Sequence, residues 1–143
     1  MNKSDNDVEI KFIDAWPKEE IVNLYKAGGW WKECYDSSGI KNLIKGSYAF
    51  AVAVDNKSGK AIGMGRIISD GVSDAYFQDI VILPKYRNKG IGKKIVEVLL
   101  EKCLSVGITW VGLIAEPDQD DFYIPIGFKP MKKYVPMKYE SED

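Results

Sequence analysis

The sequence predicts a single α/β domain, and three observations support this. Short apolar runs rich in valine and isoleucine alternate with segments of helical periodicity along the 143 residues. A chain of this length is typical of one domain and can bury a substantial core. It contains no repeat, linker or low-complexity segment. We therefore expect residues 1–143 to form one domain.

A strand and a helix are expected at the start of the chain. Residues 8–13 (VEIKFI) alternate apolar and charged side chains, as a half-buried strand does. A helix should begin at Pro17, because proline suits the first helical position and two glutamates follow it near the positive end of the helix dipole. Gly28 and Gly29 should end this helix. A second, short helix is expected near residues 40–45.

Three strands are expected in the middle of the chain. Residues 48–54 and 60–68 are joined by DNKSGK, whose residue types are common in hairpin turns. Residues 75–83 form the next strand, and its second half (IVIL) is apolar on both faces, as in a central strand covered by helices. Strict alternation would place Gln78 and Asp79 on opposite faces of this strand.

The last part of the chain continues the alternation of strands and helices. A glycine-rich loop precedes a helix over residues 92–106, and Gly107 is suited to end it. Ile91, Ile95, Val98, Leu99 and Val106 should make its apolar stripe. Residues 110–115 predict a strand, residues 117–124 a short helix, and residues 128–139 one or two closing strands.

Composition excludes several classes of function. The formal net charge is −1, so no global field attracts nucleic acid or anionic membrane, and we expect neither as a partner. The N-terminus has no apolar segment of the secretory type, and no window is apolar enough to span a bilayer, which favours a cytoplasmic location. Cys34 and Cys103 are expected to be reduced thiols.

The sequence contains no histidine. This absence removes the usual Ser-His-Asp and Cys-His triads and the histidine-based zinc sites, and we expect no metal. Catalysis would have to use Asp, Glu, Tyr or Lys side chains, backbone dipoles or a cofactor.

The loop LPKYRNKGIGKK (residues 83–94) lies between a strand and a helix. Unpaired N–H groups at the start of a helix attract anions, and glycines let a phosphate approach the backbone. The spacing does not match a Walker loop, and Ile95 stands where a dinucleotide fingerprint needs its third glycine. Taken alone, the loop could also be a tight turn that happens to be basic.

A second motif changes this interpretation. The string Arg87-Asn88-Lys89-Gly90-Ile91-Gly92 resembles motif A (Arg/Gln-x-x-Gly-x-Gly/Ala) of the GCN5-related N-acetyltransferase (GNAT) superfamily. Residues 121–128 (DFYIPIGF) resemble the family's Phe-Tyr-x-x-x-Gly-Phe signature. The order of elements also agrees over nearly the whole chain. The resemblance implies a mixed, mostly antiparallel and splayed sheet of six to seven strands, flanked by about four helices.

The resemblance also implies acetyl transfer from acetyl-CoA to an amine. The pyrophosphate would lie on the motif A residues, with the backbone of the preceding strand holding the pantetheine arm and polarising the thioester carbonyl. The cofactor-binding residues would then be Ile80, Val81, Ile82, Arg87, Asn88, Lys89, Gly90, Ile91, Gly92 and Lys93.

Two acid–base roles follow from the resemblance. Tyr123 stands where the family often uses a tyrosine to protonate the departing thiolate. Several members carry a Glu-Asp pair before the apolar run, whereas this chain has Gln78-Asp79, and we select Asp79 as the general base. Glu116 and Asp70 remain alternatives. A family asparagine that contacts CoA after the fifth strand is missing from AEPDQDD.

The identity of the acceptor is the least determined part of the predicted function. Trp30 and Trp31 follow the first helix, in a region that often walls the acceptor site in the family, and could bind a small amine through their rings. The alternative is that one tryptophan belongs to the core and the other covers it. The alternatives are a protein N-terminal acetyltransferase, a non-catalytic acyl-CoA-binding module, and an acyl carrier on Cys103. A homodimer is possible by analogy.

Overall fold

The computed structural model describes residues 7–141 of the chain, which divides into two compact units, residues 1–113 and 114–143. The first unit contains β1 (Val8–Ile13), α1 (Lys18–Ala27), α2 (Ile40–Gly46), β2 (Ala49–Asp55), β3 (Lys60–Ser69), β4 (Asp74–Ile82), α3 (Ile91–Ser105) and β5 (Trp110–Leu113). Short 3-10 turns at Ser37–Gly39 and Pro84–Tyr86 precede α2 and α3. The second unit contains α4 (Asp120–Tyr123) and a 3-10 turn at Ile124–Ile126.

The five strands form one open sheet in the order β1-β2-β3-β4-β5. Strands β1 to β4 pair antiparallel, and β5 lies parallel to β4 after the crossover through α3. The prediction of a mixed, mostly antiparallel sheet with about four helices is confirmed. Its predicted count of six to seven strands is wrong for the described residues.

The missing strands are those expected over residues 128–139. This segment forms turns and extended chain without pairing to any described strand. Pro130 and Pro136 have no N–H to donate to a ladder. The apolar side chains of the segment are largely exposed, with Met137 at 90%. The alternation read from the sequence therefore does not produce a strand here.

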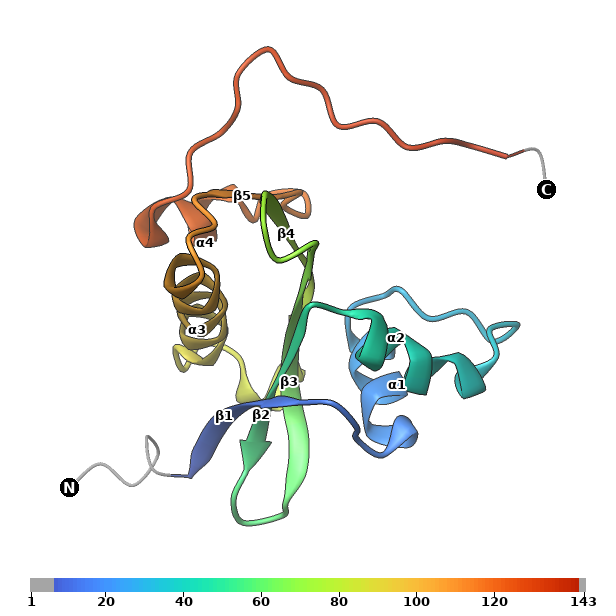
Figure 1. The fold of residues 1–143 in the computed structure, drawn as a ribbon. Helices are drawn as coiled ribbons and strands as arrows, with labels where there is room; N and C mark the ends of the chain where they lie inside the picture. The colour runs from blue at the N-terminus through green and yellow to red at the C-terminus, as the bar shows by residue number, and fades with distance from the viewer. Residues whose placement is uncertain (1–6, 142–143) are drawn as a thin grey trace. The chain divides into compact units, whose positions relative to one another are not determined.

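Two layers of helices cover the sheet of the first unit (Figure 1). On one face, α1 and α2 pack on β2, β3 and β4 through Ile21, Leu24, Ile44, Phe50, Val52 and Met64, all nearly fully buried. On the other face lies α3, whose buried residues are Ile91, Ile95, Val96, Leu99 and Cys103. Because strand residues alternate between faces, both layers draw on the same strands.

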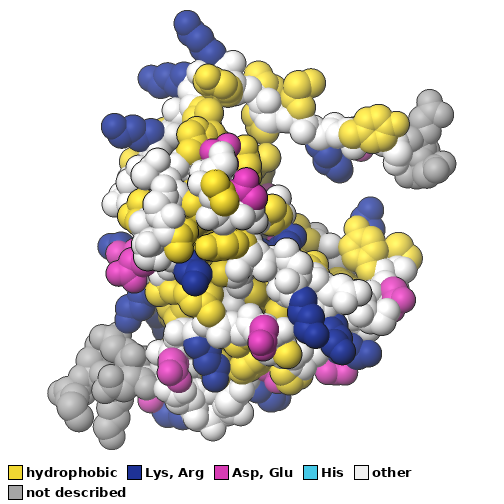
Figure 2. Space-filling view, viewed as in Figure 1, with side chains coloured by type: hydrophobic (Ala, Val, Ile, Leu, Met, Phe, Trp, Pro, Cys, Tyr) yellow, Lys and Arg dark blue, Asp and Glu magenta, His cyan; other side chains and the backbone are white. Residues whose placement is uncertain are grey.

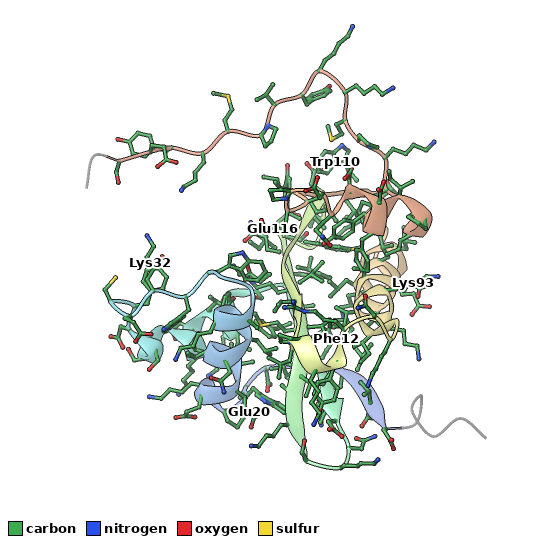
Figure 3. The ribbon with its side chains drawn as sticks, turned by 180° about the vertical axis from the view of Figure 1, so that it is seen from behind. Phe12, Glu20, Lys32, Lys93, Trp110 and Glu116 are labelled. Carbon is green, nitrogen blue, oxygen red and sulfur yellow. The ribbon has the colours of Figure 1, made fainter. Side chains whose placement is uncertain are left out.

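Local chemistry fixes the ends of the two main helices. Glu20, labelled in Figure 3, lies in the first turn of α1. It accepts hydrogen bonds from Trp16 Nε1 at 3.0 Å and from the Ala61 backbone N–H at 2.7 Å, and the second bond ties α1 to β3. Helix α3 ends before Gly107, which has a φ of 85°. Val106 was expected in the apolar stripe of α3, but it lies past the helix end and is 46% exposed.

Charged side chains of both signs are interspersed on the face shown in Figure 2. In the part of the chain that the structure describes, no helix is long and apolar enough to cross a membrane.

Candidate acetyl-CoA and acceptor site

A β-bulge interrupts β4 next to the predicted pantetheine-binding residues. Arg66 of β3 pairs with Gln78 and Met64 pairs with Val81, so that Gly65 alone lies opposite two residues of β4, Asp79 and Ile80. Asp79 adopts a left-handed conformation with a φ of 61°. The extra residue breaks the strict alternation expected from the sequence.

The bulge places Gln78 and Asp79 on the same face of the sheet. The Asp79 carboxylate contacts Tyr25 of α1, and Gln78 pairs with Arg66, which also reaches Asp79. The Ile80 side chain lies on the opposite face, near Gly65 and α3. The expectation of opposite faces for Gln78 and Asp79 is therefore wrong, because alternation holds only in a regular strand.

Past the bulge, one edge of β4 is open. The pairing of β4 with β5 ends at Phe77 and Leu113, whereas β4 continues to Ile82. Among the described residues, no strand pairs with Gln78–Ile82 on that side. The Leu83 N–H donates to the Ile62 carbonyl of β3 at 2.9 Å, so alternation directs the N–H groups of Ile82 and Ile80 toward the open edge.

The N-terminus of α3 is the next feature along the chain, after the 3-10 turn at Pro84–Tyr86. Gly90 is the residue before the helix, with a φ of 82°, and a Cβ atom added there would meet no heavy atom within 4 Å. No described side chain caps the helix. Since the first N–H groups of a helix lack intrahelical partners, those of Ile91, Gly92 and Lys93 are available to an anion.

The side chains of motif A have different surroundings. Arg87 Nε donates to the Ile82 carbonyl at 2.8 Å and its Nη2 to the Ala27 carbonyl at 3.4 Å, so this guanidinium joins the ends of β4 and α1. Lys89 Nζ lies 5.8 Å from the centre of the Tyr86 ring. Asn88 is exposed in a left-handed conformation, and Lys93 is exposed on α3 (Figure 3).

Asp79 is held by two donors at one oxygen. Its Oδ2 accepts from Arg66 Nε at 2.6 Å and from the Tyr25 hydroxyl at 2.8 Å. The side chains of Arg66 and Asp79 are only 16% and 19% exposed. Burial, followed by the Asp79 carboxylate, raises the pKa of Tyr25 well above its usual value, so Tyr25 remains a hydrogen-bond donor. Sequence reasoning missed Tyr25 and Arg66 because only the fold brings them to Asp79.

The aromatic residues after α1 form a connected group. Trp30 and Trp31 are both half-buried and pack against the core cluster that includes Ile21 and Leu24 of α1. Their rings lie 6.2 Å and 6.4 Å from that of Tyr25, and Tyr35 stands perpendicular to Trp31 at 5.4 Å. Figure 3 shows Lys32, the residue after Trp31, on the segment that follows α1. Through Tyr25, this aromatic group adjoins Asp79.

Asp70, an alternative candidate for the base, has a local structural role. Its Oδ1 accepts from the N–H groups of Val72 and Ser73, both at 2.8 Å. These backbone hydrogen bonds lower the pKa of the Asp70 carboxyl. A carboxylate that caps a turn in this way is a weaker candidate for a base than one in the β4 region.

Tyr123 belongs to the second unit, where it lies between two phenylalanines. Its ring is perpendicular to those of Phe122 and Phe128, with centroids 4.8 Å and 5.8 Å away. Burial, and to a lesser extent the negative charge of Glu116, raises the pKa of Tyr123. The phenol therefore keeps its proton at neutral pH, as a proton donor must.

The family model for the acetyltransferase (GNAT) domain matches residues 46–130, which include β2 to α4. The chain belongs to the GNAT family. Its resemblance to the two GNAT motifs is thereby confirmed, and the protein is an acyltransferase.

Relatives of the chain include proteins named as N-acetyltransferases. The chain is 29% identical over 129 residues to an uncharacterized N-acetyltransferase of Pyropia yezoensis, covering 84% of this chain and 73% of the relative. It is 30% identical to the chloroplastic GCN5-related N-acetyltransferase 2 of Arabidopsis thaliana, with 80% and 45% covered. It therefore spans less than half of that relative's length. Since that relative is named as chloroplastic, the cytoplasmic location expected for this GNAT protein stays a prediction.

Solved structures show the same GNAT fold. A probable acetyltransferase from Staphylococcus aureus aligns with a TM-score of 0.80 at 23% identity, over 94% of this chain and 98% of that one. Glucosamine-6-phosphate N-acetyltransferase from Arabidopsis thaliana aligns with a TM-score of 0.75 at 18% identity, over 93% and 97%. The aminoglycoside acetyltransferase AAC(6')-Iy, solved with a CoA bisubstrate analogue, aligns at 0.72 and 16% identity, over 94% and 99%.

Proposed function

We propose that this GNAT protein transfers the acetyl group of acetyl-CoA to the primary amine of a small molecule by direct attack in a ternary complex. The observation that carries the proposal is the open edge of β4 beside the uncapped N-terminus of α3. Both features belong to the first unit, and both present backbone donors without a requirement for particular side chains.

The start of α3 suits the pyrophosphate. Gly90 holds a left-handed turn over which an added Cβ would meet nothing within 4 Å, so an anion could approach the backbone closely. The N–H groups from Asn88 to Lys93 and the helix dipole would stabilise its negative charge. Lys89 and Lys93, both exposed, would add positive charge beside it.

The open edge of β4 suits the pantetheine arm. An extended chain with amide groups can pair with a free strand edge as an additional strand would. The outward N–H groups of Ile80 and Ile82 are the proposed donors, since the Ile82 carbonyl already accepts from Arg87. The N–H of Val81, which lies between them, points to β3. A backbone N–H on this edge would polarise the thioester carbonyl. Acetyl-CoA supplies the activated acetyl group and a thiolate leaving group.

Acid–base roles are proposed for Tyr123 and Asp79. Tyr123 would protonate the thiolate, which its raised pKa supports because the phenol is still protonated at neutral pH. Asp79 stays the predicted base for the ammonium group of the acceptor. Its contacts with Arg66 and Tyr25 also support a role in holding β4.

A small-molecule acceptor is supported by the aromatic segment after α1. Trp30 and Trp31 are bulky and half-buried, and they adjoin Asp79 through Tyr25. Relatives and structural neighbours include a serotonin N-acetyltransferase, at 29% identity over 53% of this chain, as well as the glucosamine-6-phosphate and aminoglycoside enzymes. An aromatic surface favours a flat or cationic amine.

The test is calorimetric titration of acetyl-CoA into the wild type and Gly90→Glu. The substitution places a carboxylate in the proposed pyrophosphate-binding site. Gly59→Glu is a matched control, because Gly59 has a φ of 74° and equally open surroundings, but it lies in the β2–β3 turn. Both variants therefore carry the same backbone strain and the same change of charge.

The expected result is binding by the wild type and Gly59→Glu, and a loss of affinity of at least about 100-fold in Gly90→Glu. Equal affinity in all three proteins would place the pyrophosphate elsewhere. A wild type that does not bind acetyl-CoA would overturn the proposal. If binding is found, acetylation of a panel containing arylalkylamines, amino sugars and peptides decides the acceptor class.

A further inference from the structure

We infer that Asp79 is a positioning residue: together with Tyr25 and Arg66 it forms a clamp that holds the bulge of β4 in place. The three residues come from three elements, since Tyr25 lies on α1, Arg66 on β3 and Asp79 on β4. The role in catalysis that we give this clamp rests on the proposed function, whereas its structural effect does not.

The contacts of the clamp converge on one atom. Oδ2 of Asp79 accepts from Arg66 Nε at 2.6 Å and from the Tyr25 hydroxyl at 2.8 Å. Tyr25 is 7% exposed, and the side chains of Arg66 and Asp79 are 16% and 19% exposed, so all three groups are largely removed from solvent. Hydrogen bonds to a charged group in such surroundings are stronger than those on an open surface.

The conformation of Asp79 requires support of this kind. A φ of 61° is uncommon for a residue with a side chain, and such conformations persist where neighbouring contacts hold them. Without its two donors, Asp79 could relax toward an ordinary extended conformation. The bulge would then shift, and every residue of β4 after it would change its face or its register relative to β3.

The bulge is also where the open edge of β4 begins. The last residue of β4 that pairs with β5 is Phe77, two positions before Asp79. A bulge increases the local twist of its strand and can end pairing at that point. The clamp therefore sets the direction of the edge that would hold the acetyl-CoA arm. Through Tyr25 it also joins that edge to the aromatic acceptor segment.

An asparagine at position 79 distinguishes the positioning role of Asp79 from its proposed role as a base. Both donors contact the same oxygen, so an asparagine amide oxygen in the place of Oδ2 keeps both hydrogen bonds. Asparagine also tolerates the left-handed conformation. It cannot take a proton from the acceptor. Alanine at this position loses the contacts and the proton acceptor together.

The experiment measures acetyl-CoA affinity and amide hydrogen exchange in Asp79→Asn and Asp79→Ala. The informative amides are those of Val81 and Leu83, which face β3. Asp79→Ala should weaken acetyl-CoA binding and speed these two amides by about tenfold or more. Asp79→Asn keeps both hydrogen bonds but loses the charge of the ion pair with Arg66, so both properties should change clearly less than in Asp79→Ala, whatever the effect on turnover.

The clamp would be overturned if amide exchange at Val81 and Leu83 were unchanged in Asp79→Ala. It would also be overturned if affinity and exchange changed as much in Asp79→Asn as in Asp79→Ala. If Asp79→Ala does not fold, Tyr25→Phe removes one of the two hydrogen bonds and keeps the ring contacts. It should give a smaller change of the same kind, and no change would count against the clamp. The exchange data remain decisive even if the wild type does not bind acetyl-CoA.

Discussion

Gly65 of β3 lies directly opposite the bulge of β4, and a Cβ atom added to it would be 3.2 Å from Cγ1 of Ile80. The same atom would be 2.9 Å from Cγ2 of Ile95 on α3. The absence of a side chain at position 65 therefore lets α3 and the bulged strand approach each other. This glycine is part of the site although no catalytic chemistry depends on it.

Gly65→Ala is expected to destabilise the fold by about 1–3 kcal/mol, because the new methyl group must displace Ile95 or Ile80 in a packed interior. It should also weaken acetyl-CoA binding by shifting Ile80. Chemical denaturation and calorimetry measure the two effects. Gly46→Ala is the control, since Gly46 ends α2 in open surroundings. Equal stability of the two variants would contradict the packing argument.

Tyr123→Phe should lower kcat by about 100-fold, because it removes the proposed proton donor and keeps the ring between Phe122 and Phe128. Acetyl-CoA affinity should remain within about threefold. The raised pKa of Tyr123 keeps the wild-type phenol protonated, so any activity loss from its ionisation should come only above pH of about 10. An unchanged kcat would show that another group protonates the thiolate.

Most of the first unit was predictable from sequence because its signals are local. Periodicity, Pro17 and the glycines that end α1 and α3 act within a few residues, and the predicted boundaries of β1, α1 and β2 agree with the structure to about one residue. The N-terminus of α3 could also be predicted, since glycine spacing and basic residues mark it directly.

The bulge and its clamp could not be predicted in this way. Alternation assigns faces correctly until Gln78 and fails at Asp79, where one extra residue depends on contacts with α1 and β3. Tyr25 is 54 positions from Asp79 in sequence, and nothing near it indicates that it donates to a carboxylate. The prediction of strands over residues 128–139 was wrong for the opposite reason. The local alternation is present, but the segment has no partner strand among the described residues.

The two cysteines should differ strongly in reactivity. Cys34 is exposed, whereas Cys103 is fully buried on α3 and burial raises the pKa of its thiol. A chromogenic disulfide reagent should therefore titrate one thiol in the native protein and two in denaturant. Cys34→Ser should abolish the native reaction. Rapid modification of Cys103 in the folded protein would reopen its interpretation as an acyl carrier.

Trp31→Ala is expected to raise the KM for the acceptor amine by about tenfold, a loss comparable with one cation–π or stacking contact in a partly desolvated site. Acetyl-CoA affinity should change little, because Trp31 lies on the segment after α1 and the proposed cofactor edge is on β4. The matched control is Trp16→Ala: Trp16 is also half-buried against the same core cluster, but it precedes the ten-residue α1 instead of following it. Steady-state kinetics with each substrate varied in turn separate the two constants. Equal increases of the acceptor KM in both variants would mean that Trp31 acts through core stability alone. The acceptor-binding site would then lie away from this segment.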